Sequence, residues 1–256
     1  MAGDGKHENE SIWDSAAPGW AKWESALMGV AAEATEQMLD AANVEMGMKV
    51  LDLACGAGSQ TIQAAKRVGP TGRVVANDIA KKMLTFAKSN AADAGLTNVE
   101  TLHGPAEDLS ESGLRVDAAT CRLGLMLFQS PQDALAAVRS VLVENGRLAV
   151  LVVASPQENL LFSKTMMIAL KHAGKTPPPP GSPGLFALSD PARLEDLFQA
   201  AGYIDTRVEQ VVARLSIASV GDALTMMQEA FGAYRAVLAD LCLLYTSDAA
   251  DDQWRV

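Results

Sequence analysis

An apolar run that ends in a short glycine turn constrains this chain more than any other feature. Residues 50–55 are mostly apolar, Gly56 and Gly58 follow, and an amphipathic stretch begins at Ile62. That order predicts a buried strand, a tight loop and a helix. Because the two glycines have no Cβ, the loop can adopt positive φ and a ligand can lie against its backbone. The free N–H groups at the start of the helix would face that ligand.

An acid beside this turn narrows the choice of ligand. Dinucleotide-binding folds place a pyrophosphate on a helix N-terminus behind three glycines, but Thr61 stands at the third glycine position here. The carboxylate of Asp52, four residues before Gly56, would repel a pyrophosphate and would suit a ligand that carries an ammonium group. These two residues count against a nicotinamide-dependent oxidoreductase, which we keep as a less favoured alternative.

The run resembles motif I of the class I S-adenosylmethionine-dependent methyltransferases, whose ligand has an amino-acid tail and no phosphate. The resemblance implies that S-adenosylmethionine is the cofactor. It also implies that the cofactor lies beside Asp52, Ala54, Cys55, Gly56 and Gly58.

The second strand ends in another acid, twenty residues past Gly58. A carboxylate at this place can accept hydrogen bonds from both ribose hydroxyls, although Asp78 could also serve as a helix cap. The run from Val74 to Leu84 resembles the second cofactor segment of the same family. The resemblance implies that Ile79 packs on the adenine and that Met83 belongs to the same segment.

Two later segments complete the resemblance. Residues 103–109 resemble the family's adenine-reading segment, with Ala106 and Glu107 in place but with Pro105 where an aspartate is usual. Residues 117–128 resemble the run that closes the fourth strand. The resemblance implies that the Cys121 carbonyl faces the amino-acid tail, with Arg122 beside it, and that Met126 lines the acceptor pocket; core packing is the alternative for Met126.

The first residues of the chain hold three tryptophans, at positions 13, 20 and 23. Trp20 and Trp23 resemble the aromatic leader that closes over the cofactor in the ubiquinone/menaquinone-biosynthesis-like branch. An indole face is favourable beside a sulfonium, as it is beside other cations. We therefore expect Trp23 at the cofactor, with a leader docked on the sheet as the alternative.

Strands and helices alternate between residues 30 and 200, which predicts an α/β fold with a doubly wound, mostly parallel sheet. We expect strands at about 48–54, 73–78, 98–102, 115–121, 147–154 and 205–215. Helices are expected at 28–41, 80–94, 131–143, 157–173, 190–201 and 219–240.

Three parts are expected along the chain. Residues 1–44 form an N-terminal helical leader or cap, and residues 45–241 form the methyltransferase domain. Within that domain an insertion at about 156–188, with a polyproline run, is a lid or a plain connector. Residues 242–256 resemble, over most of their length, a translated sequencing adapter, so we expect a non-native tail and a missing seventh strand.

The composition of the chain limits the partners that we expect the protein to bind. The net charge of −10 disfavours nucleic acid, because binding phosphates calls for a basic face. No apolar run approaches the ~18 residues of a membrane span, and the polar first residues resemble no secretion signal. The three cysteines fit neither a zinc site nor a disulfide framework. We expect a cytoplasmic protein without a bound metal; its oligomeric state stays open.

The function expected from the resemblance is methyl transfer from S-adenosylmethionine to a small-molecule acceptor. Alignment of the acceptor and exclusion of water would carry the reaction. No residue is predicted as a catalytic base, and the acceptor atom stays open. A non-catalytic S-adenosylmethionine-binding protein is the main alternative.

Overall fold

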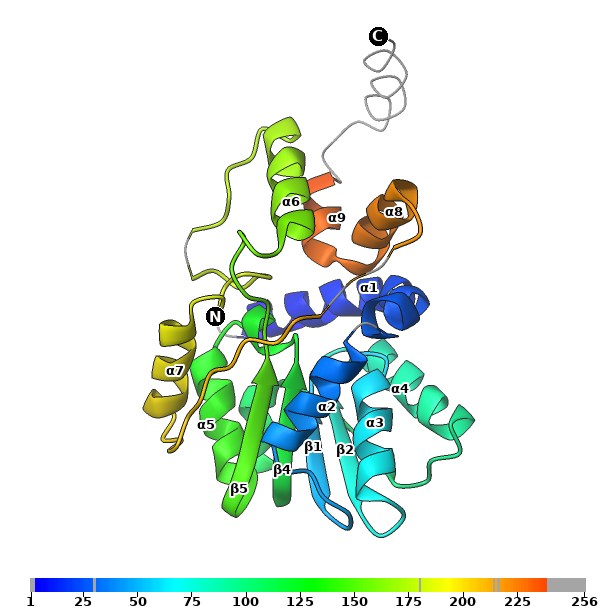
Figure 1. The fold of residues 1–256 in the computed structure, drawn as a ribbon, viewed down its shortest axis with the longest axis vertical. Coiled ribbons are helices and arrows are strands. Elements are labelled where there is room, and N and C mark those ends of the chain that lie inside the picture. Colours follow the sequence, from blue (N-terminus) through cyan, green and yellow to red (C-terminus); the bar gives the residue numbers. More distant parts are fainter. Residues whose placement is uncertain (1–2, 30, 180, 214, 216, 239–256) are drawn as a thin grey trace.

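Five parallel strands form the centre of the computed structural model, which describes residues 3–29, 31–179, 181–213, 215 and 217–238 (Figure 1). The sheet order is β3-β2-β1-β4-β5, so the chain winds outward from β1 in both directions. This arrangement confirms the predicted α/β doubly wound sheet. The strands are β1 (Lys49–Leu53), β2 (Arg73–Asp78), β3 (Val99–His103), β4 (Val116–Arg122) and β5 (Leu142–Leu151).

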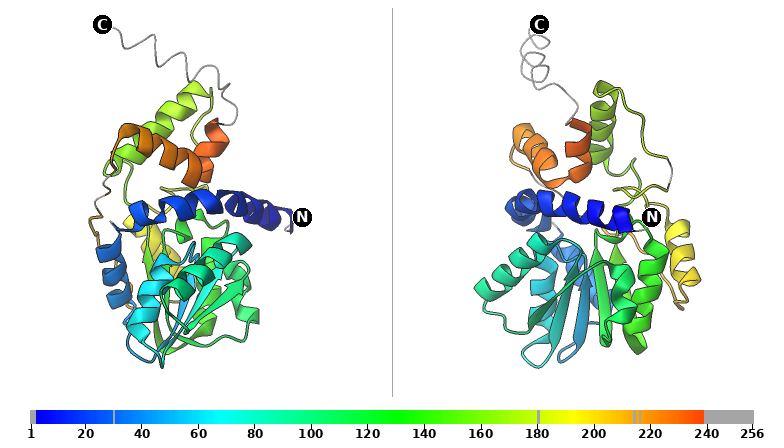
Figure 2. Two further views of the ribbon diagram at one scale, coloured as in Figure 1. Left: turned by 90° about the vertical axis from the view of Figure 1, so that its right-hand side faces the viewer. Right: turned by 180° about the vertical axis from the view of Figure 1, so that it is seen from behind.

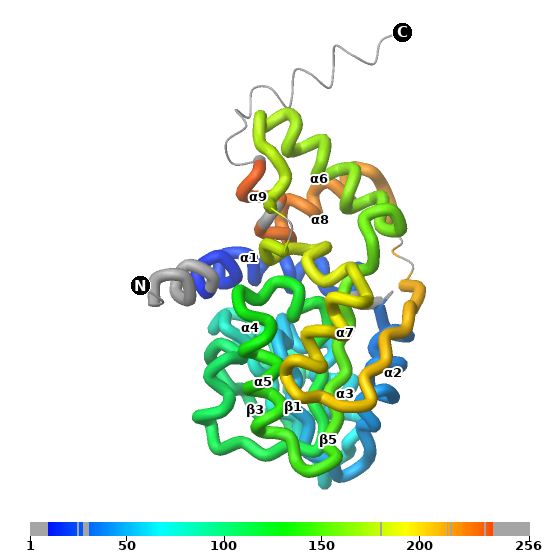
Figure 3. The backbone as a smooth tube through the Cα atoms, turned by 90° about the vertical axis from the view of Figure 1, so that its left-hand side faces the viewer, coloured from blue at the N-terminus to red at the C-terminus, as the bar shows by residue number. Residues whose placement is uncertain are grey.

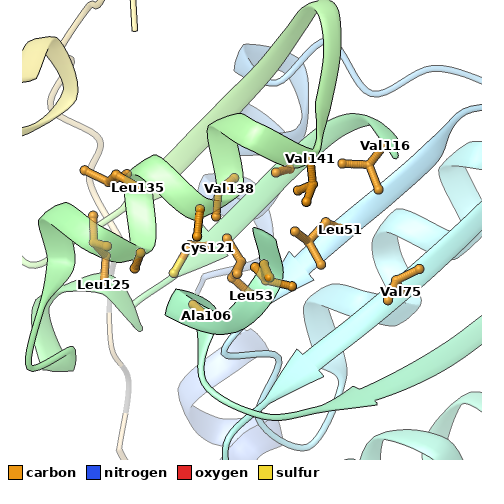
Figure 4. Packing of buried hydrophobic residues seen from close by; sticks show 14 of the residues in the cluster. Leu51, Leu53, Val75, Ala106, Val116, Cys121, Leu125, Leu135, Val138 and Val141 are labelled. Atoms are coloured by element: carbon orange, nitrogen blue, oxygen red, sulfur yellow. The ribbon is translucent and has the colours of Figure 1, made fainter. Parts of the chain in front are cut away.

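Side chains of β1 alternate between two hydrophobic cores, as the period of two in a strand requires. Val50 faces one core together with Leu39 and Val68. Leu51 faces the other core together with Leu135 and Val138 of α5 (Figure 4). Helices α2 (Ala32–Ala41), α3 (Ser59–Val68) and α4 (Lys81–Asp93) cover the first face. Helix α5 (Pro131–Val141) and short helix η1 (Ala106–Glu111) cover the second, and α7 (Pro191–Ala200) packs against α5.

A second layer of helices lies over the carboxyl ends of the strands. Helix α1 (Gly3–Gly29) runs across that edge of the sheet, and α6 (Leu160–His172), α8 (Val220–Ala230) and α9 (Gly232–Leu238) lie beyond it (Figures 1 and 2). These three helices share a separate apolar cluster that includes Leu170, Met226 and Met227. Helix α1 therefore lies between the sheet with its two cores and the apolar cluster of the upper helices.

Helix α1 approaches α8 at a glycine. A Cβ on Gly19 would lie 2.0 Å from the carbonyl oxygen of Glu229, so no larger residue fits there without a shift of one helix. Glycine and proline are both unfavourable inside a helix, yet α1 holds Pro18 and Gly19 side by side. The close contact with α8 explains the glycine.

The structure corrects four expected boundaries. Residues 205–213 form no strand; they run from α7 toward the upper helices on the β5 side of the sheet (Figure 3). An extended segment becomes a strand only when its backbone pairs with a neighbour, and the described sheet ends at β5. The helix expected at 219–240 breaks at Phe231, and the one expected at 28–41 begins at Ala32, after the end of α1. β5 begins at Leu142 rather than at 147.

The remaining predicted boundaries agree to within a few residues.

The expected lid segment contacts the turn after β4. The short helix η2 (Leu125–Leu127) follows β4, and the amide of Gly184 in the expected lid segment donates to the carbonyl of Met126 at 2.9 Å. The adapter-like tail and the expected missing strand lie outside the described residues. Within the part of the chain that is described, no helix has both the length and the apolar character needed to cross a bilayer.

Candidate functional site

The glycine turn between β1 and α3 adopts the left-handed conformations that its sequence predicts. Gly56 has φ +57° and Gly58 has φ +96°, and Ala54 shares the region with φ +48°. A Cβ on Gly58 would lie 2.8 Å from the Cα of Ala87 in α4. Gly58 therefore allows α3 and α4 to approach each other.

Asp52 lies under this turn and has no exposed surface. Its carboxylate accepts hydrogen bonds from the Thr61 hydroxyl at 2.5 Å and from the Gln60 amide. Burial raises the pKa of Asp52 to about 7, against the lowering effect of these hydrogen bonds and of Arg122. The side chain thus ties β1 to the first turn of α3.

Asp78 ends β2 at the same edge of the sheet. One carboxylate oxygen accepts from the amide of Gly56 at 3.0 Å, and the other accepts from the amide of Ala80 at 2.9 Å. The side chain is 7% exposed, and burial raises its pKa to about 6. The acid therefore joins the glycine turn to the start of α4, and the two predicted acids lie on the same side of the molecule.

The segments expected around the adenine meet at the same edge. The Asn77 side chain donates to the carbonyls of Leu102 and Gly104, both at 3.0 Å, and so holds the loop after β3 against β2. Ile79 is half-buried and Met83 is buried under Ala17 of α1. Ala106 is buried at the start of η1, and Glu107 beside it is half-buried. All four residues flank the end of β2 or the loop after β3.

The end of β4 and the turn that follows it are more deeply buried than a ligand surface would be. Cys121 is fully buried and Met126 is 3% exposed, and both belong to the core around Leu51 and Leu125. Arg122 is buried as well. Its guanidinium donates to the Thr35 hydroxyl at 2.8 Å and to the Ser59 hydroxyl, so it links the segment to α2 and α3.

Helix α1 supplies three groups to this edge, and two of them, Glu24 and Asp14, are not predicted from the sequence. The Glu24 carboxylate accepts from the amide of Ser59 at 3.0 Å, and the Asp14 carboxylate accepts from the amide of Lys82 at 2.9 Å. The indole nitrogen of Trp20 lies 3.0 Å from the position that a Cβ on Gly56 would take. The composition of the leader predicts aromatic docking, but not which face of α1 meets the sheet.

Trp23 contacts α8 rather than the glycine turn. Its indole N–H donates to Glu229 of α8 at 2.5 Å, and Lys22 donates to the same carboxylate. The ring packs with the upper apolar cluster. Trp20, rather than Trp23, is the tryptophan that contacts the glycine turn.

Negative charge dominates the electrostatics of the turn. Glu24, Asp52 and Asp78 all act on the buried Cys55 thiol and, after burial itself, raise its pKa. The nearby buried cation is Arg122, whose pKa is lowered by burial. Burial also raises the pKa of Glu24. Such a site favours a ligand with positive charge and disfavours a pyrophosphate, which fits S-adenosylmethionine with its sulfonium and ammonium groups.

Comparisons with known proteins agree with this geometry. A family model described as "Methyltransferase domain" matches residues 45–176, just over half of the chain. The ubiquinone/menaquinone biosynthesis C-methyltransferase UbiE of Pseudomonas fluorescens is 37% identical over 127 residues, which are 49% of each chain. The same enzyme of Stutzerimonas stutzeri is 39% identical over 119 residues, 46% of each chain. The matched region thus spans about half the length of these relatives.

Solved structures show the same fold. A SAM-dependent methyltransferase from Aquifex aeolicus aligns with a TM-score of 0.51 at 22% identity, over 69% of this chain and 83% of that one. The YcgJ protein of Bacillus subtilis aligns with a TM-score of 0.51 at 23% identity, over 66% and 68%. The family match covers both acids and all five strands. The chain therefore belongs to the family of class I S-adenosylmethionine-dependent methyltransferases.

Proposed function

We propose that this protein transfers a methyl group from S-adenosylmethionine to a small-molecule acceptor. The observation that carries the proposal is the hydrogen bond between the Asp78 carboxylate and the Gly56 amide. It joins the glycine turn and the acid of the second strand at one edge of the sheet, within the matched family region.

The residues of the chain have separate roles in this proposal. Asp78 accepts hydrogen bonds from the ribose hydroxyls with its remaining lone pairs, since each oxygen uses only one for the backbone. Ile79, Met83, Ala106 and Glu107 border the adenine. The turn at Ala54–Gly58, with Asp52 beneath it and Cys121 and Arg122 beside it, holds the amino-acid end, and Met126 supports the acceptor side through η2.

When bound, S-adenosylmethionine supplies a methyl group that is already activated by its sulfonium. The protein then has to align an acceptor and exclude water. His103, a titratable group near the adenine segment, already contacts the carbonyl of Ile79 at 3.0 Å and Glu10. We therefore assign no catalytic base.

The acceptor class follows from charge. The net charge of −10 and the acidic turn support a small-molecule acceptor over a nucleic acid, because binding phosphates calls for a basic face. We propose a small molecule in the cytoplasm. Because the similar enzymes are named C-methyltransferases of quinone biosynthesis, hydroxylated aromatic rings are the first acceptors to test.

Calorimetric titration with S-adenosylmethionine, S-adenosylhomocysteine and NAD tests the cofactor. We expect binding of the first two and none of NAD, and we expect Asp78→Ala to weaken both by about tenfold or more through the lost ribose bonds. Binding of NAD alone would overturn the proposal. Transfer of a radiolabelled methyl group to members of an aromatic acceptor panel then separates an enzyme from a non-catalytic binder.

A further inference from the structure

Side chains of helix α1 accept hydrogen bonds from backbone amides at the starts of two helices. Glu24 accepts from the amide of Ser59, the first residue of α3, and Asp14 accepts from the amide of Lys82 in the first turn of α4. The indole nitrogen of Trp20 lies 3.0 Å from the position that a Cβ on Gly56 would take. Three side chains of one helix thus reach the glycine turn and both flanking helix starts.

The contact of Glu24 has the chemistry of an anion site. The carboxylate is 9% exposed, and it meets a backbone N–H at the start of a ten-residue helix. The hydroxyl of the same Ser59 accepts from Arg122, which attracts Glu24 electrostatically. A helix N-terminus beside a guanidinium is the environment that a free carboxylate prefers. The amino-acid end of the proposed cofactor carries such a carboxylate.

We propose that Glu24 occupies the place of the cofactor's carboxylate, so that α1 blocks its own cofactor site until the cofactor displaces Glu24. This inference rests on the proposed function. Two carboxylates cannot share one N–H and one guanidinium without strong repulsion. The affinity for the cofactor is therefore reduced by the fraction of molecules in which Glu24 holds Ser59.

Helix α1 lies outside the family region at residues 45–176, so the block belongs to this chain rather than to the matched domain. Two further residues of α1, Lys22 and Trp23, donate to Glu229 of α8, so α1 contacts the upper helices as well as the matched domain.

The test compares two ligands that differ only at the amino-acid end. S-Adenosylhomocysteine carries the carboxylate, whereas 5′-methylthioadenosine lacks the whole amino-acid group. Both are titrated by calorimetry against the full chain, Glu24→Gln and Glu24→Met. We expect each variant to bind S-adenosylhomocysteine about fivefold more tightly, and 5′-methylthioadenosine with less than about a twofold change.

A further variant is the control. Glu33→Gln removes an exposed charge from α2 and should not change the ratio of the two affinities. Circular dichroism and urea unfolding establish that each variant is folded.

Other outcomes overturn the inference. A weaker affinity of Glu24→Gln for S-adenosylhomocysteine would make Glu24 a partner of the ammonium group instead. If the Glu24 variants bind both ligands more tightly by the same factor, the substitution has only loosened α1, and Glu24 does not compete with the cofactor's carboxylate. If the unaltered chain and the Glu24 variants all fail to bind S-adenosylhomocysteine, the proposed function fails as well; equal binding by all of them leaves that function standing and removes only the block.

Discussion

At the scale of single residues, the turn after β1 depends on a fit between two loops. Ala54 adopts φ +48°, a region that costs a residue with a side chain about 1–2 kcal/mol. A Cβ on Gly124, in the loop after β4, would lie 2.5 Å from the Cβ of Ala54. Gly124 has φ −97°, so its backbone suits any residue, and it is the contact with Ala54, with a second one to the Cys121 sulfur at 3.1 Å, that favours glycine.

This contact predicts strong coupling between two substitutions. We expect Gly124→Ala to lower the free energy of unfolding by about 1–3 kcal/mol, and Ala54→Gly in the same chain to restore most of that loss. Urea unfolding of both single variants and the double variant measures the coupling. The control is Gly184→Ala, whose Cβ would meet nothing closer than 4.0 Å. Its effect on the free energy of unfolding should simply add to that of Ala54→Gly. If the effects of Gly124→Ala and Ala54→Gly also add, the two residues are not in contact.

The buried acid of β1 predicts a pH dependence of stability. The pKa of Asp52 is about 7 in the folded chain against an ordinary 3.8, so the folded state holds the proton more tightly. Protonation of Asp52 therefore stabilises the folded state. This stabilisation is complete below about pH 4 and is lost as the pH rises toward 7. Asp52→Asn removes this dependence, because the amide resembles the protonated acid.

We therefore expect the advantage of Asp52→Asn over the unaltered chain, in the free energy of unfolding, to be larger at pH 8 than at pH 5 by on the order of 2–3 kcal/mol. Urea unfolding at the two pH values measures the difference. Asp93→Asn, an exposed acid at the end of α4, serves as the control. An identical pH slope in Asp52→Asn and the unaltered chain would show that Asp52 is ionised throughout.

Cofactor affinity should depend on pH through the acid of β2. The pKa of Asp78 is about 6, and only the ionised form can accept both ribose hydroxyls. At pH 5 about one molecule in ten has the carboxylate, so S-adenosylhomocysteine should bind about tenfold more weakly than at pH 7.5. Calorimetry at both pH values measures this ratio. Asp78→Asn should bind weakly at both, and a persistent pH effect in that variant would assign the titration to another group.

At the scale of elements, the sequence predicts those parts of the fold that local patterns determine. β2 agrees with its predicted range, and the strands around it agree within a residue or two, because each is a short apolar run that ends in a turn. The same patterns predict that Asp52 and Asp78 lie near one edge of the sheet, because each is close to the end of a parallel strand.

The elements that depend on distant partners could not be predicted in this way. Residues 205–213 have the alternation of a strand but no paired neighbour. The helix break at Phe231 coincides with ring contacts to Trp20 at 6.0 Å and to Phe162 at 5.4 Å. The choice of Trp20 over Trp23 for the glycine turn follows from the packing of α1 on α8, which no local pattern shows.

The approach of α1 to α8 predicts a local effect of one methyl group. Gly19→Ala would bring a Cβ to 2.0 Å from the Glu229 carbonyl, so we expect α1 and α8 to separate. Amide exchange should become faster in both helices and stay unchanged in β1 and β4. Gly221→Ala, in α8 where a Cβ would meet only the Ser219 side chain at 3.6 Å, should leave exchange in α1 unchanged. Uniformly faster exchange would indicate global destabilisation instead.

At the scale of the whole molecule, the two cores of the sheet and the apolar cluster of the upper helices are supported differently. The cores on the two faces of the sheet share strands that are paired by backbone hydrogen bonds. The upper cluster contains only side chains of helices and loops. Units with fewer shared contacts open at lower free energy.

We expect α6, α8 and α9 to exchange their amide protons at a lower free energy than β1 and β4. Native-state exchange at increasing urea concentration measures both, and S-adenosylhomocysteine should change protection in α1 as well as in the glycine turn. A single opening free energy for all elements would mean that the upper helices and the sheet unfold together.

The place of Trp20 has an optical consequence. Its indole lies against Gly56, with the ring of Trp13 at 6.5 Å and that of Phe231 at 6.0 Å. The emission of an indole shifts with the polarity of its surroundings, so any ligand that moves this ring from the turn alters the ultraviolet fluorescence of the protein. Arrival of a nucleoside at the turn can thus be followed in real time without a label.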